Sequence, residues 1–159
     1  MQETVKVVSA ELQNYADRGI FQNFSLVEQA SNGSVKYRFH WLAEMPFNLT
    51  LYAQKSKIEI RDILPAVPFR SEMDKEFRIF LQQRSAESVP LHRRLDDQRF
   101  TFSCKNRQEK LSITIGFQVG DGGEAAKTAV NLLHEIFNNF LLEDPYQNYM
   151  VEFFNVSEE

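Results

Sequence analysis

The stretch LSITIGFQVGDGGEAAKTAVNLLHEIFNNFLL, residues 111–142, describes a strand, a glycine-rich turn and a long helix. In its first part, apolar residues alternate with small or polar ones, at Leu111, Ile113, Ile115, Phe117 and Val119. This two-residue period predicts a strand with one apolar face. In its second part, apolar residues recur at helical spacing, at Ala126, Ala129, Val130, Leu133, Ile136, Phe137, Phe140 and Leu141. Because a helix with such a stripe has to bury it, we expect the helix to pack on the sheet that contains the strand.

A glycine-rich turn, residues 120–123, joins this strand to the helix. Asp121 is placed to accept the free backbone N–H groups of the first helical turn, and Glu124 completes the spacing of a capping box. The turn lacks the lysine and the spacing of nucleotide-binding loops, and Asp121 would repel an anion. We therefore interpret the turn as a helix cap and not as a phosphate site.

Upstream of this stretch, four more segments have the two-residue period of strands. They are residues 21–29, with Phe24 and Leu26 on one face, residues 35–41, residues 47–52 and a short strand around residues 58–60. Asn32 and Gly33 form a strong hairpin signal, and links as short as these join antiparallel neighbours. The segments therefore predict an antiparallel meander.

The remaining elements complete an α+β fold. They are a helix over residues 3–17, a helix over residues 71–86 that Ser71 caps, and a strand over residues 100–104. We expect a single antiparallel sheet of five to six strands with three helices, in the order helix, β-meander, helix, two strands, helix. Residues 1–159 are expected to form one domain, with residues 145–159 as an aromatic tail.

Composition limits the classes of function. The 18 Lys and Arg against 22 Asp and Glu give a net charge of −4, which argues against a nucleic-acid partner. A single cysteine, Cys104, cannot form an internal disulfide, and no apolar run is long enough for a membrane span. Without an export signal at its start, the chain is expected to be cytoplasmic and to bind no membrane.

No catalytic, cofactor or metal motif stands out. The three histidines, His40, His92 and His134, lie far apart, without the spacing of zinc ligands. Cys104 shares the apolar face of its predicted strand with Phe100 and Phe102, which indicates a core residue and not a nucleophile. We predict no catalytic residue, cofactor or metal; whether the protein is an enzyme stays open, and the pattern favours that it is not.

Two aromatic-rich segments are candidates for binding a partner protein. Met73, Phe77 and Phe80 form one stripe on the helix over residues 71–86, and Phe and Met are favoured in interface cores. The tail adds a second set, Tyr149, Phe153 and Phe154, after the domain is complete. Burial in the core is the alternative for both sets. If they are exposed, they form an apolar patch of the kind that marks a binding site.

The order of elements resembles that of type III secretion chaperones and YbjN-like proteins. The resemblance covers residues 3–142 and depends on element order, size and acidity, with no shared residue motif. It implies a bacterial, cytoplasmic homodimer that binds another protein and is not an enzyme. Binding would use apolar side chains or the pairing of an extended peptide with a sheet edge.

Two alternatives remain open. In the first, the sheet and the long helix enclose a pocket for a small molecule, lined by His40, Trp41 and Tyr52. In the second, the acidic chain is an immunity or inhibitor protein that binds a basic toxin in a salt-sensitive complex.

Overall fold

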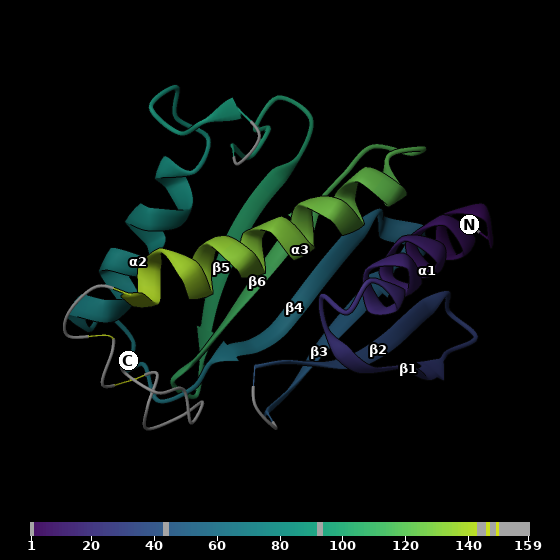
Figure 1. The fold of residues 1–159 in the computed structure, drawn as a ribbon, viewed down its shortest axis with the longest axis horizontal. Coiled ribbons are helices and arrows are strands. Elements are labelled where there is room, and N and C mark those ends of the chain that lie inside the picture. Colours follow the sequence, from purple (N-terminus) through teal and green to yellow (C-terminus); the bar gives the residue numbers. More distant parts are fainter. Residues whose placement is uncertain (1, 43–44, 92–93, 143–145, 147–148, 150–159) are drawn as a thin grey trace.

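The computed structural model describes residues 2–42, 45–91, 94–142, 146 and 149. Within these residues the chain forms three α-helices and one antiparallel sheet of six strands, in the order β1-β2-β3-β4-β6-β5 (Figure 1). The helices are α1 (Gln2–Asp17), α2 (Glu72–Gln83) and α3 (Gly122–Asn138). The strands are β1 (Gln22–Gln29), β2 (Ser34–Leu42), β3 (Met45–Tyr52), β4 (Lys57–Leu64), β5 (Thr101–Arg107) and β6 (Lys110–Gly116). The predicted α+β class and element order are confirmed.

The core lies between one face of the sheet and the helices, chiefly α1 and α3, with Phe77 and Leu81 of α2 added at its edge (Figure 1). Alternate strand residues point to this face and are almost fully buried: Val35, Tyr37, Phe39, Leu49, Leu51, Ile58, Ile60, Ile113 and Ile115. All eight apolar residues predicted for the long helical stripe are buried too. The opposite face of the sheet, called the open face below, carries the polar residues of the same alternation.

Strand β5 lies at one end of the sheet because β6, and not β5, pairs with β4. The chain comes back as β5, turns, and returns as β6, which pairs with β4 through Ile58 with Ile115 and Ile60 with Ile113. Gln108 and Glu109 form the turn with positive φ angles of 52° and 64°, the geometry that matches strand twist in a two-residue hairpin. Strand β5 therefore has β6 on one side only.

The prediction that the Asp121 side chain caps the long helix is wrong. Asp121 precedes α3 but makes no side-chain cap; its carboxylate instead accepts two hydrogen bonds from Arg99, at 3.0 and 3.1 Å. Glu124 pairs with Lys127 at 3.2 Å and makes no capping box. A guanidinium offers two charge-assisted hydrogen bonds, which outcompete neutral backbone N–H groups for the carboxylate.

Three further residues lie elsewhere than their patterns predicted. Val119 is 90% exposed, because β6 ends at Gly116 and Val119 lies in the following turn. Leu26 is 48% exposed, because β1 is irregular on both sides of it. Glu135, which is not one of the residues of the predicted apolar stripe, is nevertheless 2% exposed, and its carboxylate lies 4.0 Å from the guanidinium of Arg84.

Two residues of the tail, Tyr146 and Tyr149, pack on the body of the domain. Tyr146 is buried, stacks on Phe140 at a centroid distance of 4.8 Å and donates a hydrogen bond to Glu76. Tyr149 is partly buried, and its hydroxyl donates to the carbonyl of Pro65. Both residues therefore contact the body near the start of α2. Phe153 and Phe154 lie outside the described residues.

Candidate functional site

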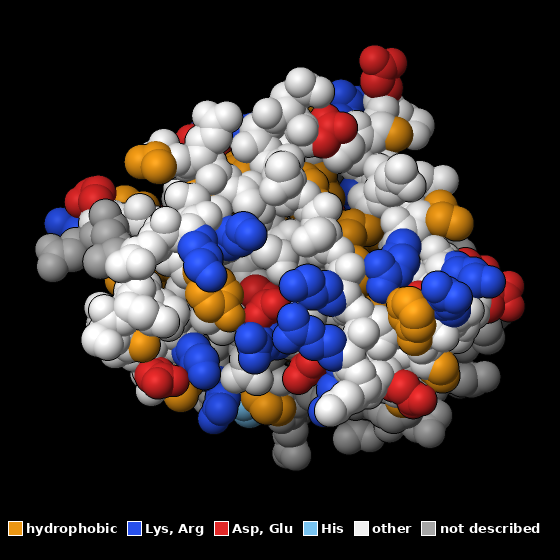
Figure 2. Space-filling model, turned by 180° about the vertical axis from the view of Figure 1, so that it is seen from behind, with side chains coloured by type: hydrophobic (Ala, Val, Ile, Leu, Met, Phe, Trp, Pro, Cys, Tyr) orange, Lys and Arg blue, Asp and Glu red, His pale blue; other side chains and the backbone are white. Residues whose placement is uncertain are grey.

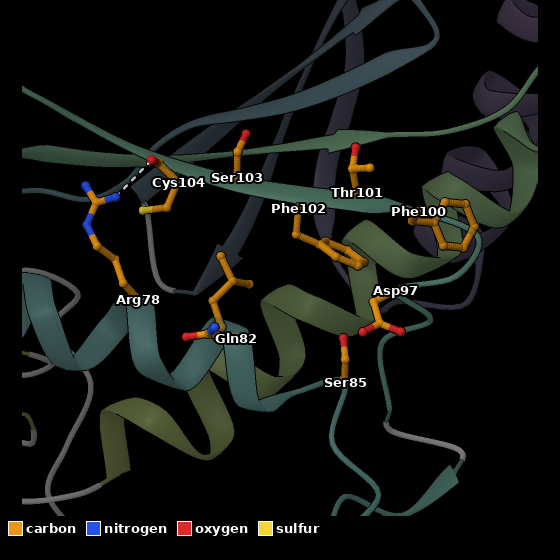
Figure 3. A pocket seen from close by; sticks show the side chains of 10 residues that line it. Arg78, Gln82, Ser85, Asp97, Phe100, Thr101, Phe102, Ser103 and Cys104 are labelled. Carbon is orange, nitrogen blue, oxygen red and sulfur yellow. Dashed lines mark hydrogen bonds between the residues drawn. The ribbon is translucent and has the colours of Figure 1, made fainter.

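A groove lies between α2 and the outer edge of β5 (Figure 3). Its volume is about 520 Å³, within the range of ligand pockets. Figure 3 shows Gln82 and Ser85 on the helix side, with Asp97 and the Phe102 ring facing them. Leu81 and Phe100 add apolar surface to the lining. We call this hollow the β5 groove.

The direction of the β5 backbone decides what the groove offers. The N–H of Phe117 donates to the carbonyl of Ser56, which precedes β4. Backbone groups alternate in direction along a strand, so Ile115 and Ile113, two and four residues before Phe117, also direct their N–H and C=O groups to β4 and away from β5. Their partners on β5, Cys104 and Phe102, therefore form non-hydrogen-bonded pairs with β6. The N–H and C=O groups of Phe102 and Cys104 consequently point outward, into the groove.

The two ends of this outward edge are occupied. At one end, Phe100 donates its N–H to the carbonyl of Asp96 at 3.0 Å. At the other end, Nη1 of Arg78 donates to the carbonyl of Cys104 at 3.1 Å (Figure 3). Between them, within the described chain, no other segment bonds to the N–H or C=O of Phe102. Between these two hydrogen bonds the edge is therefore open at Phe102, beside the groove.

A buried carboxylate holds α2 at the distance that creates the groove. Asp74, 2% exposed, accepts hydrogen bonds from Asn106 of β5 at 3.0 Å, from the Arg70 backbone at 3.2 Å and from Arg78 at 3.3 Å. Its own N–H donates to Oγ of Ser71 at 3.2 Å, which confirms the predicted cap of this helix. The cap and the carboxylate together fix the start of α2 against β5.

The electrostatics of this region fit a structural role. Burial alone raises the pKa of Asp74, but the hydrogen bonds from Asn106, Arg70 and Arg78 outweigh it and lower that pKa below 3.8. Burial raises the pKa of Cys104 to about 11, so the thiol stays protonated at neutral pH. A protonated thiol is a poor nucleophile. The lining contains no histidine, and the described residues hold no group of three metal-binding side chains.

The predicted partner-binding residues do not gather in one place. Phe77 is fully buried and packs edge-on against Phe140 at 5.4 Å, so it lies in the core and not on a surface. Phe80 is partly buried, with Arg84 over its ring at 4.4 Å. Met73 and Tyr149 line a separate hollow of about 520 Å³ at the start of α2. The α2 stripe thus packs mainly inward, which is the alternative that the sequence left open.

The three residues of the predicted small-molecule pocket are not brought together either. His40 lies opposite Pro46 and Tyr52 opposite Ser34, six positions apart along the β2–β3 hairpin, or about 20 Å. His40 and Tyr52 share the open face, away from α3, and the side chain of Trp41 is outside the described part. The inner face, where the pocket was expected, is occupied by closely packed core side chains.

Sequence reasoning placed Phe100, Phe102 and Cys104 correctly on one face but did not identify Phe102 as a site. The signal that was missing is the strand order, which makes β5 an edge. Nothing in the local alternation distinguishes an edge strand from a central one. Arg78 and Asp74 were overlooked because their partners lie 26 and 32 residues away.

Searches of protein-family models, curated proteins and solved structures found no match to this chain. Within the described residues, no helix has the length and apolar character needed to cross a membrane.

Proposed function

We propose that the protein is a non-enzymatic protein-binding module that binds an extended segment of a partner chain at the β5 groove. The observation that carries this proposal is the open backbone position at Phe102, between two occupied positions and beside a groove. An extended segment would exchange two hydrogen bonds with Phe102 and so add a short strand to the sheet. This is the sheet-edge mode implied by the resemblance to secretion chaperones and YbjN-like proteins.

The lining of the groove suggests which segments fit. A strand added to β5 would direct every second side chain toward α2, where the Phe102 ring and Leu81 provide an apolar contact. Gln82, Ser85 and Asp97 offer polar contacts at the rim. We therefore expect a ligand of about three to five residues with one apolar side chain, flanked by small or polar ones.

The chemistry of the groove supports binding in preference to catalysis. Its cysteine has a raised pKa and its lining offers no histidine as a base. Its acidic group, Asp97, is exposed, which leaves its carboxylate solvated. A homodimer in a cytoplasmic setting, implied by the same resemblance, stays a prediction.

The proposal is tested with peptides selected from a display library of random 12-residue sequences. Two variants separate backbone from side chain: Phe102→Ala removes the ring and keeps the N–H, whereas Phe102→Pro removes both. Since the N–H points away from β6, proline leaves the ladder intact. We expect Phe102→Pro to bind about five- to tenfold more weakly than Phe102→Ala, the effect of one hydrogen bond. Equal affinities would contradict strand addition at this position.

A further inference from the structure

The open face of the sheet is basic, although the chain is acidic. Its described strands carry seven exposed Lys or Arg residues: Lys36, Arg38, Lys57, Arg61, Lys105, Arg107 and Lys110. They carry three acidic residues, Glu28, Glu59 and Asp62. Figure 2 shows the molecule from this side, with Lys and Arg spread over it and few Asp or Glu between them. Since the whole chain has a net charge of −4, the remaining surface is strongly acidic.

The register aligns part of this charge in a row across the strands. Arg38 of β2 lies opposite Asn48 of β3, which lies opposite Arg61 of β4. The row continues on β6 with Ser112, whose hydroxyl accepts a hydrogen bond from the N–H of Asp62 in β4. Ser112 in turn lies opposite Lys105 of β5. With strands about 4.8 Å apart, the row is about 19 Å long.

Most of these cations have no counter-ion in the described chain. Glu59 is engaged by Arg61 at 2.5 Å and Glu28 by Lys36 at 3.4 Å. No ion pair is found among the described residues for Lys105, Arg107 or Lys110. These three line a hollow of about 250 Å³ together with Arg61, Ser112 and two acidic residues, Glu59 and Asp62, so that cations outnumber acids there by four to two. Unpaired like charges this close together repel one another, and binding of an anionic group relieves that repulsion.

We propose that the open face is a docking surface for an acidic segment of a partner protein. Charge complementarity selects an anionic occupant, and the row with its interspersed Asn and Ser side chains offers donors for carboxylates along an extended length. This surface is separate from the β5 groove, because its side chains point away from α2. The inference does not depend on strand addition.

Two other anionic occupants fit the face less well. Proteins bind single-stranded nucleic acid through aromatic side chains on which the bases stack. Tyr52 is an aromatic residue of this face, and its hydroxyl is hydrogen-bonded to Glu59 and Arg61, which places charged side chains beside its ring. An anionic membrane or a nucleic-acid backbone has a dense, uniform negative charge, which the acids on this face and the acidic remainder of the chain oppose. A polypeptide with spaced carboxylates avoids both problems.

The test measures binding of a fluorescent 12-residue peptide of alternating Glu and Ser by anisotropy, at 50 and 300 mM NaCl. The variant Lys105→Glu/Lys110→Glu reverses two charges on the open face. The control Lys6→Glu/Lys75→Glu makes the same change in net charge on α1 and α2, where both residues are exposed. We expect at least tenfold weaker binding for the first variant, less than twofold for the control, and loss of wild-type binding at high salt.

Parallel titrations with a 15-residue oligothymidylate and with vesicles containing 30% phosphatidylserine identify a competing occupant. Tighter binding of either than of the peptide would overturn the proposal, as would absence of peptide binding at 50 mM NaCl. Equal weakening by Lys105→Glu/Lys110→Glu and by the control Lys6→Glu/Lys75→Glu would also overturn it. That result would mean that binding depends on the net charge of the protein and not on the open face. The neutral variant Lys105→Gln/Lys110→Gln guards against a folding defect and is expected to weaken binding in the same direction.

Discussion

The two edges of the sheet, β1 and β5, differ in how their unpaired backbone groups are protected. Strand β1 is irregular: its pairing with β2 shifts twice, and Asn23 has a φ of 55°. Its apolar residues Leu26 and Val27 are about half exposed. Strand β5 pairs with β6 at seven successive positions without a bulge, and α2 lies beside it. The β1 edge is protected by its irregular backbone, and the β5 edge by one backbone and one side-chain hydrogen bond from neighbouring segments.

This difference indicates which edge can accept another strand. Bulges twist an edge and interrupt its ladder, so β1 offers no regular run of donors and acceptors. On β5, the N–H of Phe100 and the carbonyl of Cys104 are occupied, but the backbone between them stays regular and open. Such an edge resists uncontrolled aggregation and still admits a short segment in one register. The comparison therefore favours β5 over β1 as the edge for the proposed strand addition.

The largest expected effect comes from removing the carboxylate that holds α2 against β5. Asp74→Ala deletes three hydrogen bonds to a buried charge, and we expect it to lower the free energy of unfolding by about 2–3 kcal/mol. Urea unfolding measures this change. The control Lys75→Ala, at the exposed neighbouring position, should change the free energy by about 0.5 kcal/mol or less. A similar loss in both variants would show that Asp74 has no special role at this edge.

The same carboxylate predicts a dependence of stability on pH. Because the pKa of Asp74 is lower in the folded than in the unfolded chain, its contribution is complete above the ordinary value of 3.8 and is lost as pH falls through the folded value. Unfolding measured from pH 6 down to pH 2.5 should show a shallower loss of stability for Asp74→Asn than for the wild type. Parallel curves for the two proteins would contradict the depressed pKa.

A smaller effect is expected at the occupied carbonyl of β5. Arg78→Ala removes the hydrogen bond to Cys104 and one of the bonds to Asp74, but the Arg78 side chain is 37% exposed. We expect the free energy of unfolding to fall by about 1 kcal/mol, and the freed carbonyl to promote association through β5. Urea unfolding and concentration-dependent light scattering measure the two changes. Arg107→Ala, an exposed position on the same strand, should leave both unchanged.

The smallest effect on stability is expected at β1. Leu26→Lys/Val27→Lys alters two half-exposed side chains, so the free energy of unfolding should change by about 0.5 kcal/mol or less. If the predicted homodimer forms through this edge, sizing chromatography with light scattering will show a dimer for the wild type and a monomer for the variant. Peptide binding at β5 should stay the same. Loss of that binding would mean that the two edges do not act separately.

The fold was accessible from the sequence because its patterns are local. The apolar stripe of α3 and the Ser71 cap depend on residues three or four positions apart, and both are as predicted. The environments of Asp121 and Glu135 could not be predicted, because Arg99 and Arg84, which lie beside them, are distant in sequence. The site was hidden for the same reason. Periodicity predicts that β5 is a strand, but only the pairing of β6 with β4 makes β5 an edge with an open position at Phe102.

The most direct test of strand addition is an NMR measurement of which edge contacts a bound peptide. Isotope-filtered NOE spectra of the labelled protein with a selected peptide record distances between the two backbones. The account predicts short cross-strand contacts from the peptide to Phe102 and Cys104, and none to β1. Contacts along β1 instead, or contacts to α2 side chains without any to the β5 backbone, would contradict it.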